Sequence, residues 1–183
     1  YKKGTLIRRI ERRMGLQQIK SHRRYLEFLK STPGEVDLLF KDLLISVTAF
    51  FRDPRAWDTL SAQVMANLVG EDGYETPIRA WVPGCATGEE AYSLAILAAE
   101  QVAEAQSPRR IQIFATDVDA AALDIARAGV YPESIALDLS PQRLQRFFTH
   151  EDHRYRVAKG IRESVVFANQ NLISDPPFSK LDL

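Results

Sequence analysis

The stretch I-R-A-W-V-P-G-C-A-T-G-E-E, residues 78–90, joins a short apolar run to a loop that contains two glycines. The apolar run 78–82 predicts a β-strand, and the alanine-rich segment 89–105 after the loop predicts a helix. Gly84 and Gly88 allow a tight turn and the close approach of a ligand. Such a loop before a helix N-terminus is typical of nucleotide-type sites in α/β sheets, although a glycine turn can also serve geometry alone.

The pattern of strand and helix continues along the chain. Residues 111–115 and 165–168 predict two more strands, and residues 119–128 predict a helix between them that ends at Gly129. Alternating strands and helices favour a parallel sheet with right-handed crossovers. We therefore expect an α/β fold of the Rossmann-like type over residues 75–183.

The preceding part of the chain predicts helices only. Apolar residues recur at a spacing of four within 5–15, Ser21 is placed to cap a second helix, and S-T-P-G at 31–34 ends it. A third helix is predicted over 35–44, and Asp53-Pro54 begins a fourth, because proline suits a first turn. Residues 1–70 therefore predict a small, basic, all-α domain in front of the α/β domain.

Composition limits the possible functions. Lys+Arg and Asp+Glu both number 24, so the chain lacks the basic field that a nucleic-acid-binding protein usually carries. Its single cysteine, Cys85, excludes a disulfide framework and fits a reducing cytoplasm. No apolar run is long enough for a membrane span, so we expect a cytoplasmic protein without membrane insertion. Ten basic residues nevertheless crowd the first thirty positions, opposed only by Glu11 and Glu27.

Acidic residues near the loop select among the possible ligands. Asp117 ends the second predicted strand, where a carboxylate can accept hydrogen bonds from a ribose diol, whereas Asp119 is placed to cap the next helix. Loop and acid together fit either NAD or S-adenosylmethionine. Glu89 and Glu90 stand beside the glycines, and two carboxylates repel a diphosphate but suit the cationic end of S-adenosylmethionine. This favours a methyl donor.

Several motifs together resemble one family. P-G-C-A-T-G-E-E-A-Y-S with A-T-D-V-D is similar to the chemotaxis receptor glutamate O-methyltransferases of the CheR type. The segments S-V-T-A-F-F-R from 46, A-R-A-G-V-Y ending at 131 and F-A-N-Q-N-L from 167 resemble further motifs of that family, in the same order. The first motif most resembles the versions of it that are found in fusions with methylesterase and sensor domains. The family continues with further strands, so we expect a C-terminally incomplete methyltransferase domain here.

The resemblance implies a cofactor and its contacts. It implies S-adenosylmethionine as methyl donor, S-adenosylhomocysteine as product, and methyl esters on glutamates in the helical methylation region of chemoreceptors. Cofactor contacts are implied for Ser46, Thr48, Arg52, Glu89, Asp117, Asn171 and Leu172, and the glycine loop adds Gly84. Arg52 suits the donor's carboxylate, although a surface ion pair with Asp53 or Asp58 is the alternative, and Phe50 and Phe51 suit the core.

No residue is predicted to act as a catalytic base or a metal ligand. A substrate glutamate has a pKa of about 4.3 and is already ionised at neutral pH. His150 and His153 are spaced for a metal but lack nearby cysteines or a third ligand, and Cys85 is predicted to be a small buried residue.

The basic helix can serve as a docking surface. Acidic receptor helices suit Arg8, Arg9, Arg12 and Arg13, while a solvated helix face and contact with nucleic acid are the alternatives. A module that binds S-adenosylmethionine and a receptor without turnover also stays open.

The segment D-P-P-F, residues 175–178, raises a second enzymatic possibility. Amine methyltransferases that act on nucleobases carry a similar motif, so N-methylation is an alternative. In such sheets that motif follows the fourth strand, whereas here it follows the third. We therefore interpret Pro176 and Pro177 as a strand terminator followed by a turn.

Overall fold

The chain forms two compact units, Tyr1–Ser46 and Val47–Leu183. The structure is a computed structural model that describes residues 3–43, 48–70 and 76–183. Helices within these ranges are all too short or too polar to cross a membrane.

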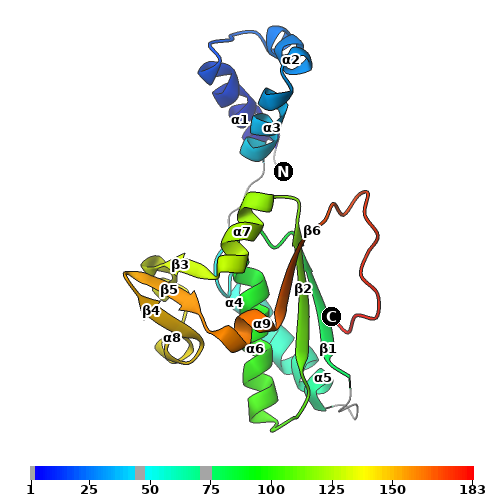
Figure 1. The fold of residues 1–183 in the computed structure, drawn as a ribbon, viewed down its shortest axis with the longest axis vertical. Helices are drawn as coiled ribbons and strands as arrows, with labels where there is room; N and C mark the ends of the chain where they lie inside the picture. The colour runs from blue at the N-terminus through cyan, green and yellow to red at the C-terminus, as the bar shows by residue number, and fades with distance from the viewer. Residues whose placement is uncertain (1–2, 44–47, 71–75) are drawn as a thin grey trace. The chain divides into compact units, whose positions relative to one another are not determined.

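Over the described residues 3–43, the first unit consists of the three helices that the sequence predicted (Figure 1). They are α1 (Lys3–Leu16), α2 (His22–Ser31) and α3 (Pro33–Leu43). Ser21 lies at the N-cap position of α2 in extended backbone, but its side chain makes no capping hydrogen bond. Proline suits the first turn of α3, because its missing N–H has no partner there in any helix.

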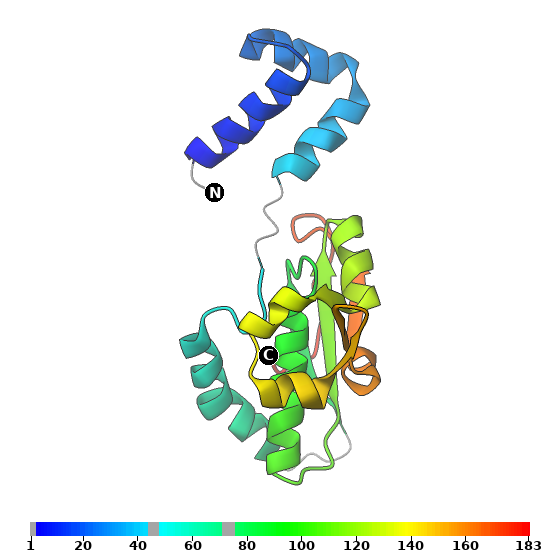
Figure 2. The same cartoon turned by 90° about the vertical axis from the view of Figure 1, so that its left-hand side faces the viewer.

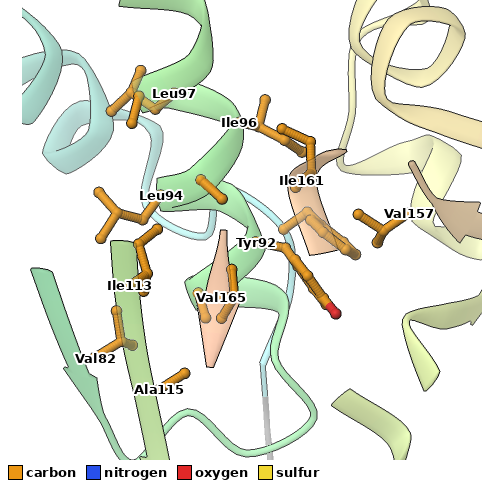
Figure 3. Close-up of a cluster of buried hydrophobic side chains, with 14 of the residues drawn as sticks. Val82, Tyr92, Leu94, Ile96, Leu97, Ile113, Ala115, Val157, Ile161 and Val165 are labelled. Carbon is orange, nitrogen blue, oxygen red and sulfur yellow. The ribbon is translucent and has the colours of Figure 1, made fainter. Parts of the chain in front are cut away.

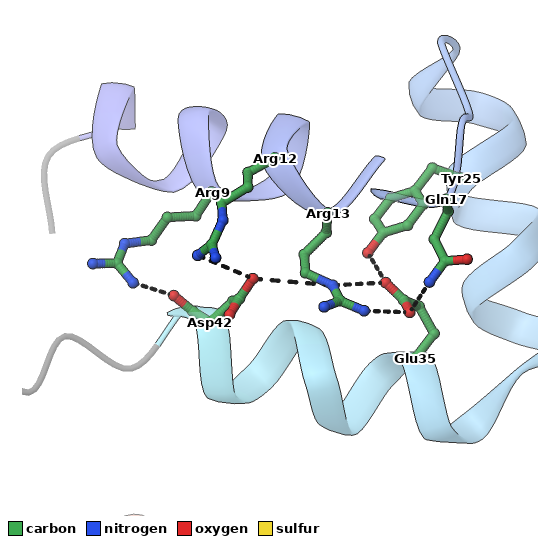
Figure 4. Close-up of polar contacts among 7 residues, drawn as sticks. All are labelled: Arg9, Arg12, Arg13, Gln17, Tyr25, Glu35 and Asp42. Carbon is green, nitrogen blue, oxygen red and sulfur yellow. Dashed lines mark hydrogen bonds and ion pairs between the residues drawn. The ribbon is translucent and has the colours of Figure 1, made fainter. Parts of the chain in front are cut away.

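A buried ion pair connects these helices (Figure 4). The Arg13 guanidinium donates to both carboxylate oxygens of Glu35, at 3.0 and 2.7 Å. The Tyr25 hydroxyl and the Gln17 amide donate to the same carboxylate at 2.8 and 2.9 Å. The hydrogen bond from Arg13, above all, lowers the pKa of Glu35, and burial opposes this effect. Both partners are buried, so the pair fixes the packing of α1 on α3.

This pair corrects the expected surface role of Arg13. Its side chain is only 9% exposed and its guanidinium is turned toward Glu35, away from any docking surface. Arg9 donates to the Asp42 carbonyl and Arg12 lies 3.8 Å from the Asp42 carboxylate. Arg8 and Arg12 are exposed.

The second unit begins with one continuous helical segment. It comprises α4 (Pro54–Thr59), the π-helical turn η1 (Leu60–Met65) and α5 (Ala66–Gly70). The Arg109 side chain donates to the Leu68 carbonyl, and the segment packs against helix α6 (Glu89–Glu104). The contacts therefore place residues 54–70 with the α/β part, whereas the sequence suggested a division after residue 70.

A parallel sheet forms the centre of the second unit (Figure 1, and turned by 90° in Figure 2). Its strands β1 (Ile78–Pro83), β2 (Ile111–Asp117) and β6 (Val165–Asn169) have the order β1-β2-β6, which confirms the predicted α/β class. The predicted crossover helices are α6 (Glu89–Glu104) and α7 (Ala120–Ala128). The Asp119 side chain caps α7 by accepting from two backbone N–H groups, as predicted, and Gly129 ends the helix at φ 60°.

The main core lies between this sheet and its helices (Figure 3). Alternate strand residues such as Ile113 and Ala115 face Leu94 on α6, and all three are buried. Ile161, on the short helix α9 (Lys159–Glu163), closes the same cluster. Each fully buried aliphatic side chain stabilises the fold by about 1.5–3 kcal/mol, so this cluster is the main stabilising element.

A second, antiparallel sheet was not predicted from the sequence. Its strands are β3 (Val130–Pro132), β4 (Phe148–Glu151) and β5 (Arg154–Val157), in the order β3-β5-β4, and the turn η2 (Glu133–Leu137) and helix α8 (Pro141–Phe147) lie between β3 and β4. Three- and four-residue strands carry too little alternation to be recognised. Asp152 and His153 form the β4–β5 turn at φ 45° and 60°, values that an Asn-Gly or Asp-Gly pair would have signalled.

The ion pair in the first unit makes a stability prediction. Glu35→Gln leaves the buried Arg13 with no carboxylate nearer than that of Asp42, 4.0 Å from its Nε, so we expect this unit to lose about 3 kcal/mol of stability. Hydrogen exchange of peptides from residues 3–43 measures the loss. The folded-state pKa of Glu35 lies below its ordinary value, so its contribution is present above pH 4.5 and disappears as pH falls through the lowered value.

The matched control is Glu27→Gln, which changes an exposed carboxylate on α2 that lies 4.0 Å from Arg23. We expect no more than about 0.5 kcal/mol there. Equal exchange in the two variants would show that the buried pair does not hold this unit together.

Candidate functional site

The carboxyl ends of the three parallel strands bring the predicted loops together. Strand pairing places Pro83 beside Thr116 and Asp117 beside Asn169. The glycine loop 84–88 therefore starts next to the end of β2, and the turn that contains Asn171 starts on the other side of β2. This is the edge of an open α/β sheet at which ligands bind.

Asp117 shapes the glycine loop directly. Its Oδ2 accepts from the Ala86 backbone N–H at 2.8 Å, and its Oδ1 accepts from the Asp119 N–H at 2.9 Å. Its main-chain carbonyl accepts from the Gln170 N–H at 3.0 Å. Each carboxylate oxygen can accept a further hydrogen bond, and the residue is half-buried. Asp117 thus organises the loop and still has the capacity to accept from a ligand hydroxyl.

Gly88 is packed too closely for any side chain. It lies at φ 94°, and an added Cβ would come within 2.9 Å of the Ala126 Cβ and 3.2 Å of both the Phe167 ring and the Tyr131 hydroxyl. That hydroxyl donates to the Thr87 carbonyl at 2.7 Å. The end of the loop is therefore fixed by α7, β6 and β3 together.

The start of α6 carries two carboxylates. Glu89 accepts from the Thr87 hydroxyl at 2.6 Å, and burial raises its pKa while this hydrogen bond opposes the effect. Glu90 is exposed. The loop therefore offers negative charge where a phosphate site would offer none, as the sequence analysis expected.

The segment 48–52 is anchored to α6. Phe50 and Phe51 are buried, as predicted, at 2% and 7% exposure. The Phe51 N–H donates to Ser93 Oγ at 2.9 Å, and that hydroxyl donates to the Glu89 carbonyl at 2.7 Å. The Phe51 backbone lies at φ 49°, which is unfavourable for a bulky residue and is held by this hydrogen bond and by ring packing against Trp57.

These contacts fix the backbone that carries two predicted cofactor residues. Thr48 is half-buried and Arg52 is exposed, on either side of the phenylalanine pair. Ser46, also predicted as a cofactor contact, lies outside the described residues.

Asn171 and Leu172 follow β6 in a tight turn. The Asn171 side chain accepts from the Ile173 N–H at 3.0 Å, and its carbonyl accepts from the Asp175 N–H at 2.9 Å. Leu172 is 56% exposed, so its side chain is available to a ligand. The turn starts beside Asp117, because Gln170 bonds to the Asp117 carbonyl.

The residues present fit S-adenosylmethionine. Gly84 lies at φ 70° with no heavy atom within 4 Å of an added Cβ, so the loop is open to a ligand on that side. The site combines a half-buried carboxylate with free acceptor capacity, at Asp117, and a second carboxylate at Glu89. This donor set suits a ribose diol and a cationic group, which S-adenosylmethionine carries together.

Other predicted and overlooked residues have structural roles. Cys85 is buried, as predicted, and burial above all raises the pKa of its thiol to about 12. His150 and His153 both contact the exposed carboxylate of Glu133, at 3.0 and 3.3 Å. The supporting roles of Ser93 and Tyr131 were not predicted from the sequence, although the two residues lie in the motifs E-E-A-Y-S and A-R-A-G-V-Y.

A parallel sheet with a glycine loop after β1 and carboxylates at the loop and at the end of β2 defines an α/β domain of the class that binds adenosyl cofactors. Comparison with known proteins specifies the family. Residues 46–183 match the SAM-binding domain of the CheR methyltransferases, and residues 1–44 match their all-alpha domain. The chain belongs to the CheR methyltransferase family, which implies S-adenosylmethionine as its cofactor.

Individual relatives agree with this assignment. The chain is 44% identical, over its whole length, to 19% of an uncharacterised 104.1 kDa protein of Rhodobacter capsulatus. It is 29% identical to the chemotaxis protein methyltransferase of Borreliella burgdorferi, over 98% of this chain and 66% of that protein. It is 31% identical to that of Salmonella typhimurium, over 100% of this chain and 59% of that protein. The chain thus spans less than two thirds of these relatives.

We predict that substitution by alanine has different effects at the two loop glycines. Gly88→Ala forces a Cβ into three neighbours at a positive φ, so we expect a loss of about 3 kcal/mol in unfolding free energy. Gly84→Ala meets open space, so we expect only about 1 kcal/mol from its positive φ. Chemical denaturation followed by tryptophan fluorescence measures both.

Gly160→Ala, at an exposed glycine of α9 with open space and no positive φ, is the control; because alanine favours a helix over glycine, stability should not fall. A Gly88→Ala protein as stable as this control would contradict the packing described for the loop.

Proposed function

We propose that the chain is a protein-glutamate O-methyltransferase unit that forms methyl esters on glutamates of chemoreceptors. The observation that carries the proposal is the pairing of Asp117 with the Ala86 N–H, which joins the acidic end of β2 to the glycine loop after β1. Membership of the CheR methyltransferase family supports the proposal.

The proposed cofactor contacts divide between the two ends of the donor. Asp117 accepts from the ribose, Asn171 and Leu172 flank the adenine, and the open side of Gly84 lets the donor lie against the loop. At the other end, Arg52 and Thr48 bind the carboxylate of the methionyl part, Glu89 binds its ammonium group, and Ser46 completes the expected set. When bound, S-adenosylmethionine supplies an electrophilic methyl group on a sulfonium centre.

The chain's own contribution is positioning. A substrate glutamate has a pKa of about 4.3, so it is a carboxylate at neutral pH and needs no base to become a nucleophile. Alignment of the reacting groups and exclusion of water then provide the rate enhancement. The rigid anchoring of residues 50–51 to Ser93 and the packing of Gly88 support such a preorganised site.

The first unit is proposed to bind the acidic methylation helices of the receptor. Residues 1–46 contain eleven Lys and Arg against five Asp and Glu, although the whole chain is neutral. Arg8 and Arg12 are exposed on α1 and offer the surface, with Arg9 beside them, whereas Arg13 supports it from inside. Opposite charges accelerate the encounter of such partners. The proposal also includes methylesterase and sensor domains that are fused to this chain in the full protein.

Binding of the cofactor product gives the first test. Calorimetric titration with S-adenosylhomocysteine should show binding, with NAD as the negative control. Asp117→Asn removes one anionic acceptor from the site, so we expect a loss of about ten- to a hundredfold in affinity. Asp124→Asn, an exposed carboxylate on α7 next to Arg127, should bind like the original protein. A folded protein that binds NAD but no S-adenosylhomocysteine would overturn the proposed function.

The type of bond formed gives the second test. Transfer of a labelled methyl group to an acidic receptor helix should yield label that alkali releases as methanol, because esters hydrolyse and methylamines do not. Alkali-stable label would favour amine methylation instead. Binding of both ligands without transfer would favour a module that binds without turnover.

Charge reversal on α1 extends this assay. The double variant Arg8→Glu, Arg12→Glu should lower kcat/KM at low salt by about tenfold and weaken its salt dependence, with cofactor affinity unchanged. Lys159→Glu, at an exposed lysine in the second unit, is the matched control. Identical rates in all three proteins would exclude this surface from receptor recognition.

A further inference from the structure

The segment D-P-P-F is bonded back to the turn that precedes it. The Asp175 carboxylate accepts from the Asn171 N–H at 2.8 Å and from the Ser174 hydroxyl at 3.0 Å. The hydrogen bond from Asn171, followed by that from Ser174, lowers the pKa of Asp175, so the carboxylate stays ionised in this turn. Asp175 thus closes the five-residue turn in which Asn171 and Leu172 stand.

Gln170 connects the two ends of the same turn. Its backbone N–H donates to the Asp117 carbonyl at 3.0 Å, and its side-chain amide donates to the Pro176 carbonyl at 2.7 Å. The side chain is only 8% exposed. One buried glutamine therefore joins the end of β2, the start of the turn and the D-P-P-F segment.

Phe178 anchors the far end of the segment on the sheet. Its ring stacks on Phe114 at a centroid distance of 4.7 Å and meets Trp81 edge-on at 5.6 Å. Trp81 is held in turn by a 3.0 Å hydrogen bond to the Thr116 hydroxyl. Side chains alternate between the two faces of a strand, so Trp81 and Phe114 lie on the face opposite the residues that pack against α6.

Arg79 adds further contacts at the same place. Its guanidinium lies 5.0 Å from the centre of the Phe114 ring and donates to the carbonyls of Ser179 and Lys180, at 2.8 and 3.1 Å. The Phe178 ring is thus held by Phe114 and Trp81, and the backbone that follows it is held by Arg79.

We propose that residues 175–178 act as a clamp that positions Asn171 and Leu172 against the adenine of the cofactor. Gln170, Asp175 and Phe178 are the positioning residues, and they act through the turn without touching the ligand. A turn held in one conformation before binding loses less entropy when the ligand arrives, which raises affinity. This inference rests on the proposed function and explains the D-P-P-F motif without base recognition, because the Phe178 ring is packed on the sheet.

Phe178→Ala tests the clamp. It removes the aromatic anchor, and aromatic pairs of this kind correspond to about a two- to tenfold effect on an equilibrium. We expect calorimetric titration to show that loss of affinity for S-adenosylhomocysteine, and Phe178→Tyr to restore it. Ile173→Ala is the matched control, since Ile173 is in the same turn but 97% exposed.

Methylthioadenosine, which lacks the amino-acid end of the donor, separates an effect at the adenine end of the site from an effect at the amino-acid end. Phe178→Ala should weaken methylthioadenosine and S-adenosylhomocysteine by the same factor, because the clamp acts on the adenine end. Arg52→Ala should weaken S-adenosylhomocysteine alone.

Asp175→Ala provides a second variant that leaves the core intact, since Asp175 is exposed. We expect a loss of about two- to fivefold from the missing hydrogen bonds. Unchanged affinity in both Phe178→Ala and Asp175→Ala, with binding by the original protein, would overturn the clamp and leave the proposed function intact. No binding by the original protein would overturn the proposed function and the clamp together.

Discussion

The close packing of Gly88 is the constraint on which the rest of the second unit depends. Its neighbours Ala126, Tyr131 and Phe167 come from α7, β3 and β6, so three separate elements meet at one backbone atom. Gly88 is also the N-cap residue of α6 at φ 94°, so α6 starts immediately after the loop. The loop then lies beside Asp117, and the site has its shape before any ligand arrives.

The polar contacts of the site form one connected arrangement. Asp117 holds the Ala86 N–H through its side chain and the Gln170 N–H through its carbonyl, so the two loops beside β2 depend on the same residue. Replacing Asp117 should therefore have a large effect, since it disturbs the loop as well as any contact with a ligand. The same arrangement extends through Gln170 to Pro176 and so includes a segment outside the loops themselves.

The neutral net charge of the chain conceals an uneven distribution of charge, which is concentrated in the first unit. The chain is neutral, yet eleven basic residues stand among its first 46. One of them, Arg13, is used to hold Glu35 inside the unit, where the Glu35 carboxylate also accepts from Tyr25 and Gln17. A buried pair of this kind fixes how α1 and α3 pack, and this leaves exposed arginines on α1 in a defined position.

The sequence by itself determined the local structure and the order of the elements. Glycine and proline positions, the Asp119 cap and the apolar periodicity depend on neighbours in the chain, so the longer helices, the three parallel strands and the glycine loop were predictable from it, whereas the short helix α9 was not. Only the tertiary structure decided which face of α1 is buried, that residues 54–70 belong to the second unit, and that Phe178 packs on Trp81 and Phe114. These features depend on contacts between residues distant in sequence. The short strands β3, β4 and β5 belong with them, because their pairing partners, not their own residues, make them strands.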